Sequence, residues 1–138
     1  MNLKAKMYRV DIGKMQKPLS ELLSSYGLPK GIFPKNATHY EWEENSSKLT
    51  VFLPSILEMG FKDSSIVRYA MKVSGTLSQG KFMNIEGMKT KILVWVKVTS
   101  ITIEDSNAKK VCFMAGMRKS RPWDAYDVVR DGIEGEVF

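Results

Sequence analysis

Apolar and polar residues alternate along most of this chain, from about residue 37 to residue 117. Tyr40 and Trp42 are separated by polar residues, and Leu49, Val51 and Leu53 repeat the same two-residue period. This period is typical of β-strands that bury one face. Polar turn segments at residues 44–47, 79–81 and 105–108 separate the alternating runs. The pattern predicts about seven short strands joined mostly by tight turns.

The clearest alternating run covers residues 91–104. Ile92, Val94, Val96 and Val98 share one parity, whereas Ile101 and Ile103 have the other. A shift by one residue turns every side chain to the opposite face, so we expect a β-bulge or sharp bend near residues 99–100. Trp95 lies on the outward side of the first half, where it would cover a helix or a second apolar layer.

Helical spacing is confined to the two ends of the chain. Leu3, Met7 and Val10 have a loose helical period, and a second helix is predicted from Pro18 to Gly27, with a leucine stripe between them. Residues 28–34 contain two prolines and a glycine and predict an extended connection. Residues 122–129 predict a short helix, and residues 137–138 predict an edge strand.

These elements together predict a mainly β protein. We expect an antiparallel, barrel-like, two-sheet domain over residues 28–138, preceded by an N-terminal helical segment over residues 1–27, with a short C-terminal helix and one domain overall. Strands do not alternate with long helices, so a doubly wound α/β fold is disfavoured.

Composition excludes several classes of protein. The chain has 138 residues, of which 43% are hydrophobic and 26% charged, as in an ordinary globular domain. Its single cysteine excludes an internal disulfide framework. Residues 1–7 lack the apolar core of a secretory signal, and no apolar run is long enough to span a bilayer. We therefore expect an intracellular, cytoplasmic protein, whose oligomeric state the sequence leaves open.

Residue types that carry chemistry are sparse. His39 and Cys112 are the only histidine and cysteine, so neither a metal site nor a cofactor is expected. Nucleotide-binding glycine motifs and a serine nucleophile elbow are also missing from the sequence. We interpret His39 as a surface residue and Cys112 as a buried, inert thiol, and we predict no catalytic residue.

Two weaker signals suggest binding. The chain has nine methionines, and methionine is common at adaptable apolar binding surfaces. Core filling is the favoured explanation, and a cavity for one small apolar ligand is the sharper alternative, with lining candidates Met71, Met83, Met114, Met117 and Trp95. The net charge of +6 gives a second signal, whose densest cations are Lys109, Lys110, Arg118, Lys119 and Arg121. These five form either a solvated face or a weak anion-binding site.

Several short segments, taken together and in order, are similar to a plant family known as domain of unknown function 538. They are residues 31–34, 49–54, 61–65, 85–91, 94–98, 115–121, 125–126 and 130–132. The resemblance runs from about Pro18 to the end of the chain. It implies a land-plant source and a barrel-like, two-sheet β fold after a helix. It also implies relatives compared with lipid-binding proteins or with hydrolases of pigments, but no catalytic residue can be transferred.

Three functional hypotheses remain. The leading one is a non-enzymatic module that binds an apolar or amphipathic ligand such as a lipid. The second is an ester hydrolase, which needs a serine or Cys112 close to His39 in space. The third is a protein- or nucleic-acid-interaction module that uses the basic cluster and weakens with salt; nucleic acid is the less favoured partner.

Overall fold

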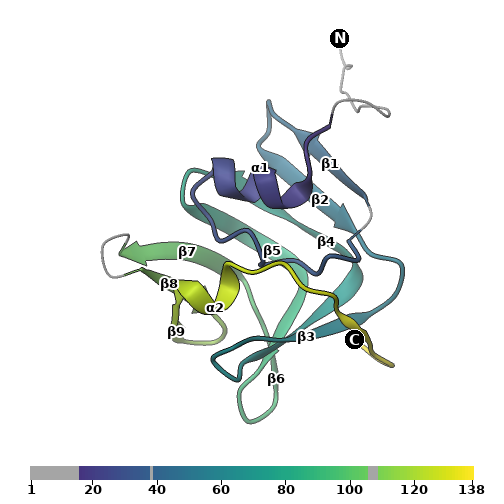
Figure 1. Cartoon of the computed structure of the whole chain (residues 1–138), viewed down its shortest axis with the longest axis vertical. Helices are drawn as coiled ribbons and strands as arrows, with labels where there is room; N and C mark the ends of the chain where they lie inside the picture. Colours follow the sequence, from purple (N-terminus) through teal and green to yellow (C-terminus); the bar gives the residue numbers. More distant parts are fainter. Residues whose placement is uncertain (1–15, 38, 106–108) are drawn as a thin grey trace.

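The computed structural model describes residues 16–37, 39–105 and 109–138. The helix predicted around Leu3, Met7 and Val10 lies outside these ranges. The described elements are, in order, α1 (Leu19–Ser25), β1 (His39–Glu43), β2 (Lys48–Phe52), β3 (Leu57–Gly60), β4 (Ile66–Ser78), β5 (Lys81–Lys91), β6 (Trp95–Lys97), β7 (Ser100–Asp105), β8 (Lys110–Met114), β9 (Arg118–Pro122), α2 (Trp123–Tyr126) and β10 (Ile133–Glu134) (Figure 1).

The strands in these ranges form one antiparallel sheet of ten strands. Its main path runs β1-β2-β4-β5-β7-β8-β9, while β3 and β10 join beside β4 and β6 joins beside β5. The mainly β, antiparallel architecture with a helix near each end is therefore confirmed. The predicted second sheet and the closure into a barrel are not confirmed, because the described strands form one sheet and β1 and β9 end its path without pairing with each other.

The two longest strands, β4 and β5, pair with each other and bend where their pairing is irregular. Their pairing changes register between Tyr69 and Ser74. Gly87 faces this bend with φ +95°, and a Cβ there would lie 2.4 Å from the carbonyl oxygen of Lys72, so only glycine fits. The bend allows one half of β4 to pair with β3 and the other half with β2.

The single strand predicted over residues 91–104 is wrong, although the expected interruption is present. β6 pairs with the end of β5 and β7 with its beginning, and β7 starts at Ser100. Because β5 continues to Lys91, residues 92–94 form the turn of a β5–β6 hairpin instead of a strand. Leu93 and Val94 are therefore exposed at its tip. The edge strand predicted at residues 137–138 is also wrong; the short strand near the C-terminus is β10.

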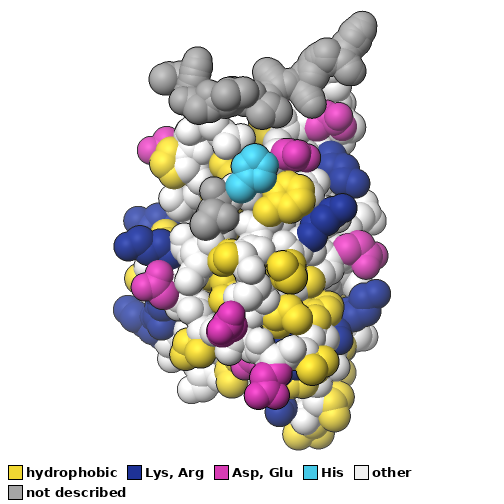
Figure 2. Space-filling model, turned by 90° about the vertical axis from the view of Figure 1, so that its right-hand side faces the viewer, with side chains coloured by type: hydrophobic (Ala, Val, Ile, Leu, Met, Phe, Trp, Pro, Cys, Tyr) yellow, Lys and Arg dark blue, Asp and Glu magenta, His cyan; other side chains and the backbone are white. Residues whose placement is uncertain are grey.

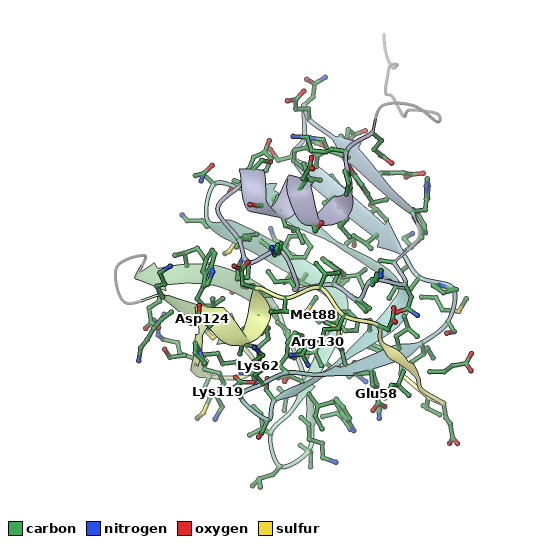
Figure 3. All side chains as sticks on the ribbon, in the orientation of Figure 1. Glu58, Lys62, Met88, Lys119, Asp124 and Arg130 are labelled. Atoms are coloured by element: carbon green, nitrogen blue, oxygen red, sulfur yellow. The ribbon has the colours of Figure 1, made fainter. Side chains whose placement is uncertain are left out.

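One hydrophobic core joins the helices to the sheet. Leu22 and Leu23 of α1 and Ala125 and Tyr126 of α2 are buried in the same cluster as the inward side chains of the strands. The amide of Gly31 donates to the carbonyl of Tyr126 at 2.9 Å, which ties the connection after α1 to α2. The interior is filled by large side chains, including Tyr69, Phe82, Phe113 and Met88; Figure 3 labels Met88 among them.

Candidate functional site

An open groove of about 350 Å³ lies beside the beginning of α1, bounded by the connection over residues 30–37 and by β1. Side chains from four segments line it: Gln16, Lys17, Pro18, Leu19, Ser20, Leu23, Lys30, Phe33, Pro34, Lys35, Ala37, His39, Tyr40 and Val129. Its volume is at the lower end of the range for small-molecule sites.

Local sequence chemistry builds one wall of the groove. Pro18 precedes α1, and its carbonyl accepts hydrogen bonds from the amides of Glu21 and Leu22 at 3.0 and 3.1 Å. A helix that begins there places Leu19 and Leu23, four residues apart, on one face. Leu23 is buried and Leu19 half-buried, so this face contributes apolar surface to the groove.

The opposite wall is held by hydrogen bonds between the segment before α1 and β1. The Tyr40 hydroxyl donates to the carbonyl of Lys17 at 2.5 Å, and the side-chain amide of Gln16 donates to the carbonyl of Tyr40 at 3.1 Å. Phe33 and Pro34, which also line the groove, are buried. The floor is therefore apolar and fixed by the fold.

The rim of the groove is cationic. Lys17, Lys30 and Lys35 are exposed around it, as is His39, and none of the lining residues is acidic. An apolar floor under several cations is complementary to a molecule that has an apolar body and one anionic group.

A second polar site lies inside the protein, around Arg121. This side chain is only 9% exposed. Its Nη1 donates to the hydroxyl of Tyr126 at 3.2 Å, its Nη2 donates to Thr90 Oγ1 at 3.1 Å, and its guanidinium lies 4.6 Å from the ring centre of Phe113. The guanidinium is thus buried among hydroxyls and an aromatic face.

The hydroxyls continue from Arg121 to a carboxylate. Ser65 Oγ donates to Asp63 Oδ1 at 2.6 Å and shares a short hydrogen bond with the Tyr126 hydroxyl. Because a serine has one proton to donate, Tyr126 donates to Ser65. Burial raises the pKa of Tyr126 to about 12, against the lowering effect of Arg121. Tyr126 therefore stays protonated at neutral pH.

Four of the segments that carry the family resemblance meet in this buried cluster. Residues 61–65 supply Asp63 and Ser65, residues 85–91 supply Thr90, residues 115–121 supply Arg121 and residues 125–126 supply Tyr126. Figure 3 labels Lys62 and Lys119, which mark the loop before β4 and the strand β9 that contribute to it. Since each polar group has a partner, the cluster joins distant segments of the fold.

The methionine candidates differ in exposure. Met71, Met83 and Met117 are exposed, and Met114 is partly exposed. Trp95 is half-buried on β6, where the Arg68 guanidinium lies 3.8 Å from its ring centre.

The five cations of the basic cluster have different environments. Lys109 and Lys110 are exposed, Lys119 is half-buried and Arg121 is buried. Arg118 forms an ion pair with Glu104 at 2.8 Å. Hydrogen bonds from Ser120 and Arg118 lower the pKa of the Glu104 carboxyl. Part of this positive charge is therefore already neutralised or buried.

The two residues of the hydrolase hypothesis are far apart in the strand order. His39 lies on β1, exposed and stacked on Phe52 with ring centres 5.2 Å apart, whereas Cys112 is buried on β8 near the other edge. Ser20 lines the same groove as His39, but no hydrogen bond joins them in the described structure. In the described ranges, no group of three or more His, Cys, Asp or Glu residues is suitably placed for a metal ion.

Sequence reasoning missed both the groove and Asp63, Ser65 and Tyr126. A signal for the groove was present, because Lys30 and Lys35 flank the proline-containing apolar connection that forms its floor. No local signal marked the buried cluster, since its members are up to 63 positions apart.

Comparisons with known proteins identify the same family as the sequence segments that carry the resemblance. The sequence model of the family described as "Protein of unknown function, DUF538" matches residues 19–127. An Arabidopsis thaliana protein described as "Uncharacterized protein" is 55% identical over 126 residues, covering 91% of this chain and 72% of that protein. No helix in the described part of the chain is long and apolar enough to cross a membrane. Because the family model matches most of the chain and this relative is 55% identical to it, the chain belongs to the plant protein family DUF538.

Proposed function

We propose that this protein is a binding module for a small amphipathic anion, such as a medium-chain fatty acid, held in the groove beside α1. The observation that carries the proposal is the composition of the groove: an apolar floor that includes Leu23 and Phe33, under a rim of lysines without a carboxylate. Apolar surface provides most of the affinity in such sites, and the few charged groups select the ligand.

Titration calorimetry with decanoate and with 1-decanol tests this proposal. These ligands share the aliphatic chain and differ in the anionic group, so we expect decanoate to bind more tightly. The double variant K30E/K35E should weaken decanoate binding about tenfold, because each exposed ion pair is worth up to about 1 kcal/mol. K48E/K81E, which makes the same change at two exposed lysines outside the groove, is the control.

Two adjacent valines provide a matched test of the apolar floor. Val129 lines the groove and Val128 does not, although both are exposed to a similar extent, 36% and 38%. V129E should reduce decanoate affinity strongly, and V128E should not. Equal affinity of the two variants, or no heat with decanoate for the wild type, would contradict the proposal.

Ester hydrolysis is the second candidate, because Ser20 and His39 line the same groove. Catalysis would require the Ser20 hydroxyl and the His39 ring to come within hydrogen-bonding distance of each other when a substrate binds. Release of p-nitrophenol from p-nitrophenyl decanoate, lost in both S20A and H39A, would favour it over simple binding. Binding of decanoate without turnover of the ester would exclude it.

A further inference from the structure

The end of the molecule opposite α1 carries a bare apolar tip. Leu93 is 90% exposed and Val94 is 66% exposed in the turn between β5 and β6. This hairpin is the lowest part of the molecule in Figure 1, and the corresponding end in Figure 2 is capped by hydrophobic side chains. Two adjacent aliphatic side chains with this exposure lose contact with water only when another molecule covers them.

A third exposed apolar side chain lies in a turn beside β6. Met117, in the turn between β8 and β9, is 59% exposed. Its neighbour Gly116 lies beside β6, because a Cβ on Gly116 would be 3.7 Å from Val96 Cγ1. The turn between β8 and β9 therefore approaches the strand β6 that leads away from the tip.

The outer face behind the tip is rich in cations. Arg68 is paired with Lys89 across β4 and β5, and Lys89 with Lys97 across β5 and β6. Lys91 is paired with Trp95 in the next position of the same hairpin. Directly paired residues share a face of the sheet, so the four cations and the tryptophan lie together.

Few carboxylates neutralise this face. Glu58 pairs with Arg68 at 2.6 Å, and Glu86 lies 3.8 Å from Lys97 in a contact that is exposed on both sides. The Lys91 ammonium lies 5.5 Å from the ring centre of Trp95. Lys89 Nζ donates to the main-chain oxygen of Phe138 at 2.7 Å. Four cations thus face two side-chain carboxylates and this oxygen, and Lys91 and Lys97 are exposed.

We infer that this end of the protein docks on an anionic lipid bilayer, with Leu93 and Val94 entering the interface and Lys91 and Lys97 contacting lipid phosphates. A projecting turn fits into a deformable surface, and the half-buried Trp95 lies behind it at the level that an amphipathic ring prefers. Bare aliphatic side chains offer nothing to the phosphates of a nucleic acid, and a projecting tip offers no concave seat for a protein.

Co-sedimentation with vesicles tests the inference. The full chain should bind vesicles of phosphatidylcholine mixed with phosphatidylserine and bind pure phosphatidylcholine much less. L93S/V94S should lower the apparent partition coefficient by about tenfold or more, because the removed aliphatic groups no longer leave water. M71S/M83S removes two exposed apolar side chains elsewhere and should bind as the wild type does.

Charge reversal tests the second half of the inference. K91E/K97E should weaken binding to the mixed vesicles by about tenfold, since each cation near an anionic surface contributes a few-fold. K48E/K81E, with the same net charge, should lose much less. Equal loss in the two variants would show that only net charge matters and would overturn the assigned docking face.

Quenching by brominated lipid reports the position of the hairpin directly. We expect brominated phosphatidylserine to quench wild-type tryptophan emission and to quench W95F less, because Trp42 and Trp123 lie on β1 and α2. Unchanged quenching in W95F, absence of vesicle binding by the wild type, or capture of the same tip by a protein in place of vesicles would each refute the inference.

Discussion

Asp63 and Arg121 are connected through two hydroxyl groups. Arg121 Nη1 lies 3.2 Å from the Tyr126 hydroxyl, which donates to Ser65 Oγ, and Ser65 Oγ lies 2.6 Å from Asp63 Oδ1. Hydrogen bonds through the two hydroxyls thus link the buried Arg121 guanidinium to the Asp63 carboxylate. They join β9 and α2 to the loop before β4.

The first prediction concerns this chain of hydroxyls. S65A should lower the free energy of unfolding by about 1–3 kcal/mol, because Asp63 and Tyr126 both lose a partner in a partly buried setting. Urea denaturation followed by tryptophan fluorescence measures the change. S64A, at the exposed neighbouring serine, should change it by less than about 0.5 kcal/mol.

If the hydrogen-bonded hydroxyls of Ser65 and Tyr126 act as a unit, the losses of unfolding free energy caused by S65A and Y126F should not be additive. The double variant should lose less than the sum of the single losses, since each variant breaks the same connection. Additive losses would show that the two hydroxyls contribute independently.

The second prediction concerns alkaline pH. Burial raises the pKa of Tyr126 to about 12, from a usual value of 10.0. The folded state therefore keeps a proton that the unfolded state loses, so stability falls as the pH rises from about 10 to 12. The pKa of Tyr69 is also raised by burial, which adds in the same direction. Urea unfolding at increasing pH should show this loss, and Y126F should lose about 2–3 kcal/mol less across that interval.

The third prediction separates two glycines. G87A should lower the free energy of unfolding by more than about 2 kcal/mol, because Gly87 has φ +95° and its new Cβ would meet the Lys72 carbonyl at 2.4 Å. Gly60 has nothing within 4 Å of such a Cβ. G60A should therefore leave the thermal midpoint unchanged or raise it. Equal effects would contradict the account of the bend between β4 and β5.

The fourth prediction concerns the thiol. Cys112 is buried on β8. A disulfide reagent such as Ellman's reagent should react with it slowly in the native protein and rapidly in guanidinium chloride. Rapid reaction in the native state would restore Cys112 as a candidate nucleophile.

Local features of the sequence were enough to predict several elements. Pro18 and Gly27 bracket α1, because proline suits a first helical turn and glycine adopts the positive φ of +78° found there. Alternation predicted β1 and β2, whose Tyr40 and Val51 are paired and buried. These predictions succeeded because the helix and strand periods and the turn residues act over a few positions.

The apolar pattern gave a wrong prediction where the position of a residue depends on which strands pair. Val94 has the alternation of a buried strand residue, yet it lies at a hairpin tip because β5 extends to Lys91 and must turn there. Whether an apolar residue faces the core or water depends on which strands pair, and residue types do not encode partners that are distant along the chain.

The sequence by itself determined a mainly β chain with a leading helix, a basic balance, and no framework for metal or disulfide chemistry. Only the tertiary structure decided that the sheet stays open, that lysines surround an apolar groove beside α1, and that Arg121 meets Asp63 through Tyr126 and Ser65. The physical reason is that these features depend on long-range packing, in which segments distant in sequence satisfy one another's buried polar and apolar surface.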